Sequence, residues 1–213
     1  MASSFKMQET YTKSKLDFLF KDNPIKDVDR INCARLRKSL RPRTWKDRIP
    51  FGVCIDKTQN KAYFLYYKSF FQKAIIPIDN NSFSNLEDIC VNDKGLIFVA
   101  DSDRDSIFCF LLNKDLKSTT LKYIIPIKKP LRCEIIGNKE IAVLTQENKI
   151  VIFKTYQNKY IKKENISKKI NSYFQKEKFI DISISTYKQT HVYVLSDKAI
   201  FKFDNSGNLL KSK

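Results

Sequence analysis

Apolar and polar positions alternate with a period of two along most of the chain after residue 50. This alternation predicts β-strands, and β-branched and aromatic residues are enriched in the same runs. The clearest stretch, 86–110, reads as a strand, a turn with Gly95, a second strand, an Asp-rich turn and a third strand. Three further stretches follow the same order. The sequence therefore predicts four repeated β units.

The spacing of the units indicates how many strands each contains. First strands are predicted at 51–55, 87–91, 132–136 and 180–184, so their starts are 36, 45 and 48 residues apart. Second strands are predicted at 61–67, 95–101, 140–146 and 191–197, and third strands at 68–73, 106–111, 149–154 and 198–203. A fourth strand is expected near 74–78, 121–127, 159–166 and 208–212. Such spacing is typical of four-stranded propeller blades.

The second unit carries a more specific signal. Asp93-Lys94-Gly95, Val99-Ala100-Asp101 and Ile107–Phe110 follow one another in the order of a Gly turn, an apolar strand closing in Ala-Asp, and an apolar strand ending near Phe. In this order, residues 86–112 resemble the NHL repeat. The resemblance implies a β-propeller, and the other three units keep the rhythm without the Ala-Asp closure. They have Tyr66-Tyr67, Thr145-Gln146 and Ser196-Asp197 there.

The predicted fold is all-β: a four-bladed β-propeller, or a partial propeller, of four-stranded antiparallel blades over 50–213. Its units span about 50–80, 84–128, 130–167 and 178–213, behind a basic amino-terminal arm (1–49) that is mostly irregular or short-helical. A lone blade leaves both faces apolar, so blades must stack. The alternatives are a closed ring, an arc completed by dimerisation or by a partner, and a β fold other than a propeller. An arc leaves edges and a blade face to be covered.

Composition limits the class of protein. With 42% hydrophobic residues among 213, the chain has enough apolar surface to fold, and no run of about 18 apolar residues predicts a membrane span. The amino terminus lacks the apolar run of a secretory signal. The five cysteines show no CxxC spacing, which favours reduced thiols in a core. We therefore expect an intracellular, soluble protein, cytoplasmic or nuclear and not secreted.

Charge is uneven. The net charge is +17, and the 32 lysines are spread along the chain, whereas six of the eight arginines lie within 30–48. Arginine suits bidentate phosphate contacts, and tryptophan offers a stacking plane. A nucleic-acid backbone, an acidic protein or membrane surface, and a purely structural leader all remain open as explanations of this tract. The candidate polyanion-binding residues are Arg30, Arg35, Arg37, Lys38, Arg41, Arg43, Trp45, Lys46 and Arg48.

Few residues point to catalysis. The turn from Asp101 to Asp105 lacks the glycine and glutamate of a calcium loop, so its short side chains are expected to bond their own turn. Asp88 and Asp181 are the candidate carboxylate pair near the axis, and His191 is expected at the surface. The chain has no phosphate-binding glycine loop, serine elbow or CxxC motif. The sequence therefore predicts no catalytic residue, no metal and no cofactor.

These observations favour a non-catalytic protein-interaction or scaffold module of an intracellular assembly. It is expected to bind a protein partner, or to self-associate, through blade edges or loops. The alternative is a module that binds RNA or DNA backbone through the Arg-rich tract 30–48. An axis-centred hydrolase or lyase is the third class. A second basic cluster at 159–178 is predicted to form the last strand of the third unit and a loop into the fourth.

Overall fold

The computed structural model describes residues 30–37, 48–69, 72–78, 83–92, 94–113, 118–136, 140–156, 159–174, 177–185 and 189–212. For residues 30–37, 48–51, 65–69, 72–76 and 156 it describes the backbone alone. The described chain forms four antiparallel sheets of four strands, each an up-and-down meander in sequence order. The predicted all-β architecture of four-stranded blades is confirmed.

Each sheet takes its strands from one continuous stretch of sequence. Sheet 1 contains β1 (Arg30–Arg37), β2 (Arg48–Asp56), β3 (Lys61–Ser69) and β4 (Gln72–Ile78). Sheet 2 contains β5 (Leu86–Val91), β6 (Leu96–Asp101), β7 (Ser106–Leu112) and β8 (Thr119–Pro126). Sheet 3 contains β9 (Pro130–Ile136), β10 (Glu140–Thr145), β11 (Ile150–Tyr156) and β12 (Lys159–Lys162), and helix α2 (Glu164–Ser172) follows it. Sheet 4 contains β13 (Phe179–Ser185), β14 (His191–Ser196), β15 (Ile200–Asp204) and β16 (Leu209–Ser212).

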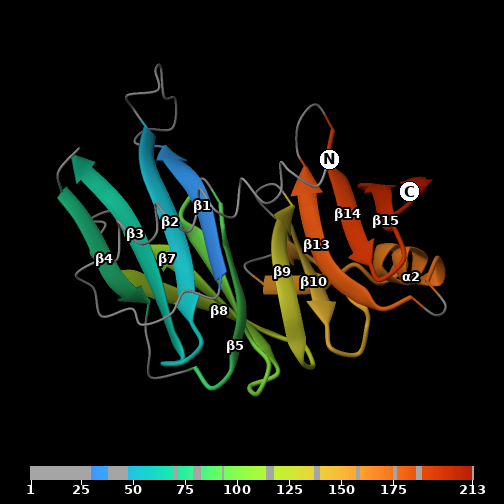
Figure 1. Cartoon of the computed structure of the whole chain (residues 1–213), viewed down its shortest axis with the longest axis horizontal. Helices are drawn as coiled ribbons and strands as arrows, with labels where there is room; N and C mark the ends of the chain where they lie inside the picture. Colours follow the sequence, from blue (N-terminus) through green and yellow to red (C-terminus); the bar gives the residue numbers. More distant parts are fainter. Residues whose placement is uncertain are drawn as a thin grey trace.

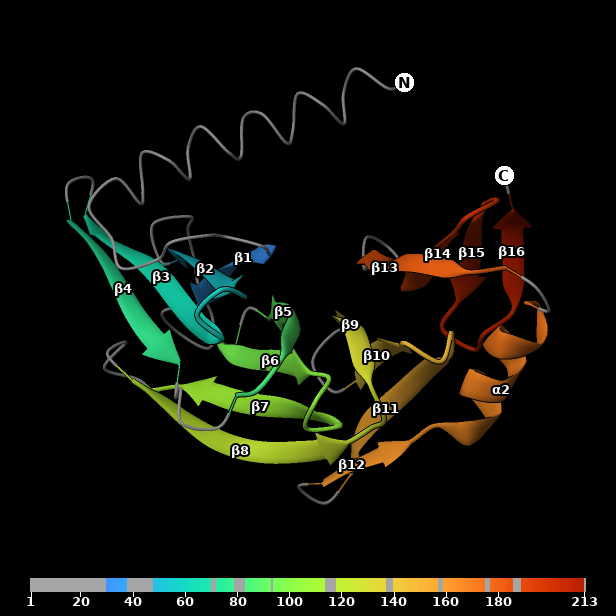
Figure 2. The same ribbon diagram turned by 60° about the horizontal axis from the view of Figure 1, so that its bottom comes forward.

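The sheets follow one another around an arc (Figure 1), and Figure 2 shows sheets 1 and 4 at its two ends. The first strands lie on the inside, where β1 contacts β5, β5 contacts β9 and β9 contacts β13. Three apolar cores fill the space between successive sheets. Within the described residues, none of these cores joins sheet 4 to sheet 1. The described sheets thus form an open arc (Figure 2), which is the partial form of the predicted propeller.

Stacking explains why the middle strands are apolar at nearly every position. In β6, Ile97 and Val99 pack toward sheet 1, whereas Phe98 and Ala100 pack toward sheet 3. Because successive side chains of a strand point to opposite faces, a blade between two neighbours needs apolar residues on both. Gly95 adopts a φ of 77°, which allows the tight turn into β6.

The first unit differs from the prediction. The chain 30–37, which we predicted as part of an irregular arm, forms β1 and pairs with β2 along its whole length, from Arg30 opposite Ile55 to Arg37 opposite Arg48. The run predicted as the first strand of unit one is therefore the second strand of sheet 1. The boundary at 49/50 falls inside β2. The predicted third strand at 68–73 is not one strand, because residues 68–69 end β3 and residues 72–73 begin β4. Backbone hydrogen bonding with β2 overrode the polar composition of β1.

Helix α2 is the second departure. Part of the sequence predicted as the fourth strand of unit three, 159–166, forms only the short strand β12, and the chain then turns into α2. Ile166 and Ile170 pack into the core between sheets 3 and 4. The turn between β15 and β16 lies close by, because a Cβ on Gly207 would lie 3.2 Å from both isoleucine side chains. The helix thus covers the outer side of this core (Figure 2).

Candidate functional site

The Asp-rich turn of sheet 2 is a structural element. Asp101 is fully buried, and its carboxylate accepts backbone hydrogen bonds from Ser84 (2.6 Å), Asn85 (3.0 Å) and Arg104 (3.2 Å). It therefore ties the second-to-third-strand turn to the segment that leads into β5. This outcome matches the expectation that the short side chains bond the backbone. Within the described residues, no group of three or more histidine, cysteine, aspartate or glutamate side chains is arranged to hold a metal ion.

A set of bonds that the sequence analysis did not predict connects successive blades. A residue near the end of the turn between second and third strands has a positive φ in sheets 1, 2 and 3. Its side chain accepts a hydrogen bond from a backbone N–H at, or directly before, the start of the next sheet. Asparagine and aspartate tolerate this conformation best among non-glycine residues. The signal in the sequence was an Asn or Asp closing each turn. The bonds are Leu86 N–H to Asn60 (3.3 Å), Lys129 N–H to Asp105 (2.8 Å) and Phe179 N–H to Asn148 (2.6 Å).

The inner strands place three charged residues at equivalent positions. Asp88, Arg132 and Asp181 lie opposite Ala100, Leu144 and Leu195 in their own sheets. The Asp88 carboxylate accepts the backbone N–H of Cys133 at 2.9 Å. Asp181 Oδ1 lies 3.6 Å from Arg132 Nε, an ion-pair distance.

The proposed pair of carboxylates, Asp88 and Asp181, thus contacts different partners, with Arg132 at the position between them. General acid–base work by two carboxylates needs both at one reacting group, and the described contacts give each a separate structural role. His191 begins β14 at a half-buried position, with its ring 6.4 Å from that of Tyr193. Neither site gains a catalytic partner from the described geometry.

The predicted polyanion-binding residues divide into two groups. The backbone of Arg30, Arg35 and Arg37 lies in β1, and Arg48 begins β2. The register places Arg37 directly opposite Arg48. The other five candidates, Lys38, Arg41, Arg43, Trp45 and Lys46, lie outside the described residues. Polyanion binding by this tract stays a prediction.

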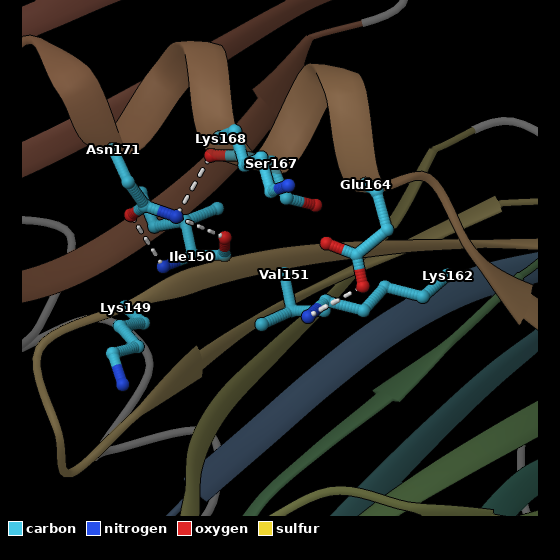
Figure 3. A pocket seen from close by; sticks show the side chains of 8 residues that line it. All are labelled: Lys149, Ile150, Val151, Lys162, Glu164, Ser167, Lys168 and Asn171. Carbon is cyan, nitrogen blue, oxygen red and sulfur yellow. Dashed lines mark hydrogen bonds and ion pairs between the residues drawn. The ribbon is translucent and has the colours of Figure 1, made fainter.

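A hollow of about 380 Å³ lies between α2 and the outer strands of sheet 3 (Figure 3). Several of its polar side chains already bond the fold. Ser167 Oγ accepts the N–H of Ile152 at 3.0 Å, and Lys162 pairs with Glu164 at 3.0 Å. The hollow therefore lies between α2 and β11, where the helix occupies the place of a longer fourth strand. Its lining residues are Lys149, Ile150, Val151, Lys162, Glu164, Ser167, Lys168 and Asn171.

The described cysteines belong to the cores, as their apolar surroundings in the sequence predicted. Cys90, Cys109 and Cys133 are free and buried, and Cys54 is also buried. Burial raises the pKa of the Cys109 thiol to about 12, so the unreactive protonated form dominates at neutral pH. Burial also raises the pKa of Cys90.

The fold and its turns can now be compared with known proteins. Residues 83–110 match the NHL repeat. The match covers β5, β6 and most of β7, and it confirms the predicted resemblance to an NHL-type propeller. The Asp101 bonds to Ser84 and Asn85 lie wholly within the matched segment. A search among curated proteins finds no match to the chain.

Solved structures similar to this chain include β-propellers. YCF48 bound to D1 peptide has a TM-score of 0.50 at 11% identity, over 85% of this chain and 51% of that one. The nidogen/laminin complex has a TM-score of 0.51 at 9% identity, over 76% of this chain and 58% of that one. At these identities the likeness shows the fold alone. The chain spans about half the length of the propellers it matches. Within the described part, no helix is long and apolar enough to cross a membrane.

Proposed function

We propose that this protein is a non-catalytic protein-interaction module that acts as a scaffold in an intracellular assembly. The proposal rests on one observation: the carboxylates that are the best candidates for catalysis form bonds that hold the fold together. Asp101 bonds three backbone N–H groups, Asp88 bonds the backbone of the next blade, and Asp181 lies beside Arg132. What the four blades present to solvent is a curved set of loops, strand edges and one open blade face, which suits binding of a protein.

The similar structures support a binding role by analogy. YCF48 was solved with a peptide bound, and nidogen was solved in a complex with laminin. A shared fold is a weak warrant for a shared function, so the proposal depends on a direct test. The affinity-tagged full chain is used to capture partners from native cells, before and after nuclease treatment of the extract. Proteins retained after nuclease at 200 mM salt support the scaffold role. Retention of nucleic acid alone contradicts it.

The second candidate is an RNA- or DNA-associated module. The register supports it in one respect: Arg37 and Arg48 lie opposite each other on neighbouring strands, so two arginines of the tract come together in sheet 1. Mobility shifts with unrelated RNA and DNA at 50 and 200 mM salt test it, because binding by several phosphate contacts weakens steeply with salt. Binding that survives replacement of Arg35, Arg37, Arg41 and Arg43 with glutamine excludes the tract as the anchor.

A further inference from the structure

The outer face of sheet 4 has the same arrangement of cross-strand pairs by which sheets 2 and 3 pack against the next sheet. In sheets 2 and 3, two cross-strand pairs of the middle strands pack against the next sheet. The register places Leu195 opposite Ile200 and Tyr193 opposite Lys202 at the same positions of sheet 4. The pairs in sheets 2 and 3 are Ala100 with Ile107, Phe98 with Cys109, Leu144 with Ile150, and Ala142 with Ile152.

In sheet 4 these positions belong to none of the three cores formed by the described residues. Ile200 is 51% exposed and Leu195 is 38% exposed, whereas Leu144 and Ile150, their equivalents in sheet 3, are fully buried. Ile180, in the bulge of β13 next to this pair, is 48% exposed. Leu195 and Ile200 thus expose a cross-strand apolar pair on a face built to the same plan as a buried one, and Ile180 adds exposed apolar surface on the neighbouring strand. Contiguous apolar surface of this kind marks an interaction site.

At the opposite end of the arc, two described side chains on the outer face of sheet 1 are buried. Cys54 and Tyr63 lie opposite each other on β2 and β3, on the side of sheet 1 that faces away from sheet 2. Both are nevertheless buried. Among the described side chains of the two end sheets, the exposed apolar face therefore lies at the sheet 4 end. Closure of a ring by a second copy would need the sheet 1 face to receive it, and Cys54 and Tyr63 on that face are already buried.

Charge indicates the chemistry of the occupant. Lys202 and Lys211 lie directly opposite each other on β15 and β16, and Lys202 Nζ lies 5.8 Å from the centre of the Tyr193 ring. Like charges placed opposite each other destabilise a sheet. Neither lysine forms an ion pair with another described residue. An acidic partner would relieve this repulsion, whereas a second copy of a chain with net charge +17 would increase it.

The turn of sheet 4 also differs from the turns that clamp the next blade. Its Ser196 hydroxyl oxygen accepts the N–H groups of Lys198 and Ala199, both at 3.1 Å. Over the described residues 189–212, only Gly207 has a positive φ, and it belongs to another turn. The described bonds of this turn join its own residues and Lys178, directly before β13, which suits a face that binds a separate molecule.

We propose that the outer face of sheet 4 binds a separate acidic protein. Its apolar side chains pack on Leu195, Ile200 and Ile180, and its carboxylates pair with Lys202 and Lys211. This proposal rests on the interaction role proposed above and names its surface. Apolar anchors ringed by charge-paired polar groups are the usual arrangement of a protein–protein contact.

The test uses a random 16-residue peptide library displayed on phage and selected against the full chain. Expected peptides combine leucine, isoleucine or phenylalanine with aspartate or glutamate. Their binding should weaken at least tenfold in Ile200→Asp and in the double variant K202E/K211E. Ile124→Asp is the matched control, because Ile124 is 54% exposed on the outer strand of sheet 2. Circular dichroism and the urea midpoint confirm folding, and Leu195→Ser provides a milder variant.

The outcomes separate the two proposals. Peptides that bind Ile200→Asp as tightly as the parent chain overturn this surface and leave the interaction role standing. Selection of basic peptides overturns the acidic partner. An absence of enrichment overturns both proposals. Sedimentation of the full chain from 1 to 100 μM provides the last arm: a dimer that Ile200→Asp abolishes would make a second copy the occupant.

Discussion

Asn171 forms two hydrogen bonds with the backbone of Ile150, one in each direction. The N–H of Ile150 donates to Asn171 Oδ1 at 2.9 Å, and Asn171 Nδ2 donates to the Ile150 carbonyl at 2.7 Å. An outer strand would make the same two bonds. Because β12 ends at Lys162, β11 would otherwise leave these groups unpaired at the seam with α2. A helix side chain thus completes the edge of sheet 3.

Replacing Asn171 with leucine should therefore destabilise the protein by about 1–3 kcal/mol, since a partly buried backbone donor and acceptor lose their partners. The urea unfolding midpoint measures the effect. Ser172→Ala is the control, because Ser172 is exposed and bonds only within the helix, to the Lys169 carbonyl. Its expected change is within about 0.5 kcal/mol. Equal effects of the two variants would contradict the role given to Asn171.

The buried carboxylate of Asp101 gives a second prediction. Asp101→Asn places an NH₂ donor among three backbone N–H donors, so we expect a loss of about 1–3 kcal/mol in the free energy of unfolding. Asp103→Asn lies in the same turn and removes a surface ion pair with Lys129 (3.2 Å). That pair contributes about 0–1 kcal/mol. A change at position 103 as large as that at 101 would show that charge, and not backbone bonding, is decisive.

Asn148 tests the contact between sheets 3 and 4. Its side chain bonds both the N–H of Phe179 and the carbonyl of Glu177, and its φ is 61°. Asn148→Gly removes the two bonds and keeps the backbone relaxed, whereas Asn148→Ala also adds left-handed strain of about 1–2 kcal/mol. Relative to the parent chain, hydrogen exchange should accelerate more in β13 than in β6 for both variants. The acceleration should be larger for the alanine variant. Uniform acceleration across all sheets would contradict a local clamp.

Glu147 gives a prediction on pH. The ion pairs with Lys128 (2.5 Å) and Lys149 (2.9 Å) lower the pKa of its carboxyl to about 2, from an ordinary value of 4.5. A lowered acid pKa contributes stability that is complete above the unfolded value and is lost as the pH falls toward the folded one. Glu147→Gln should therefore lower the urea midpoint slightly at pH 7. The difference from the parent chain should shrink between about pH 4.5 and pH 2, and also in 1 M salt because the pair is exposed. A difference that grows on acidification would contradict the assignment.

The sequence by itself determined the strand-turn-strand repeat, because a blade stacked on both sides requires apolar residues at nearly every middle-strand position. Leu96–Asp101 and Glu140–Thr145 were predicted to within about a residue for this reason. The bond of Asp101 with the Arg104 N–H in its own turn was also predictable, since aspartate in a tight turn bonds local backbone, whereas its bonds to Ser84 and Asn85 were not predicted. The NHL resemblance over one unit followed from the same residues.

Only the tertiary structure decided the first strand, the helix and the ends of the arc. The sequence Arg30–Arg37 carries three arginines, and its strand exists because β2 offers a free edge over the same length. Helix α2 is rich in lysine and asparagine, and its place depends on the unpaired edge of β11, which no local pattern reveals. Whether Leu195 and Ile200 are core or surface depends on the presence of a neighbouring blade. A sequence pattern records which side chains suit burial, whereas the packing of distant segments decides which of them are buried.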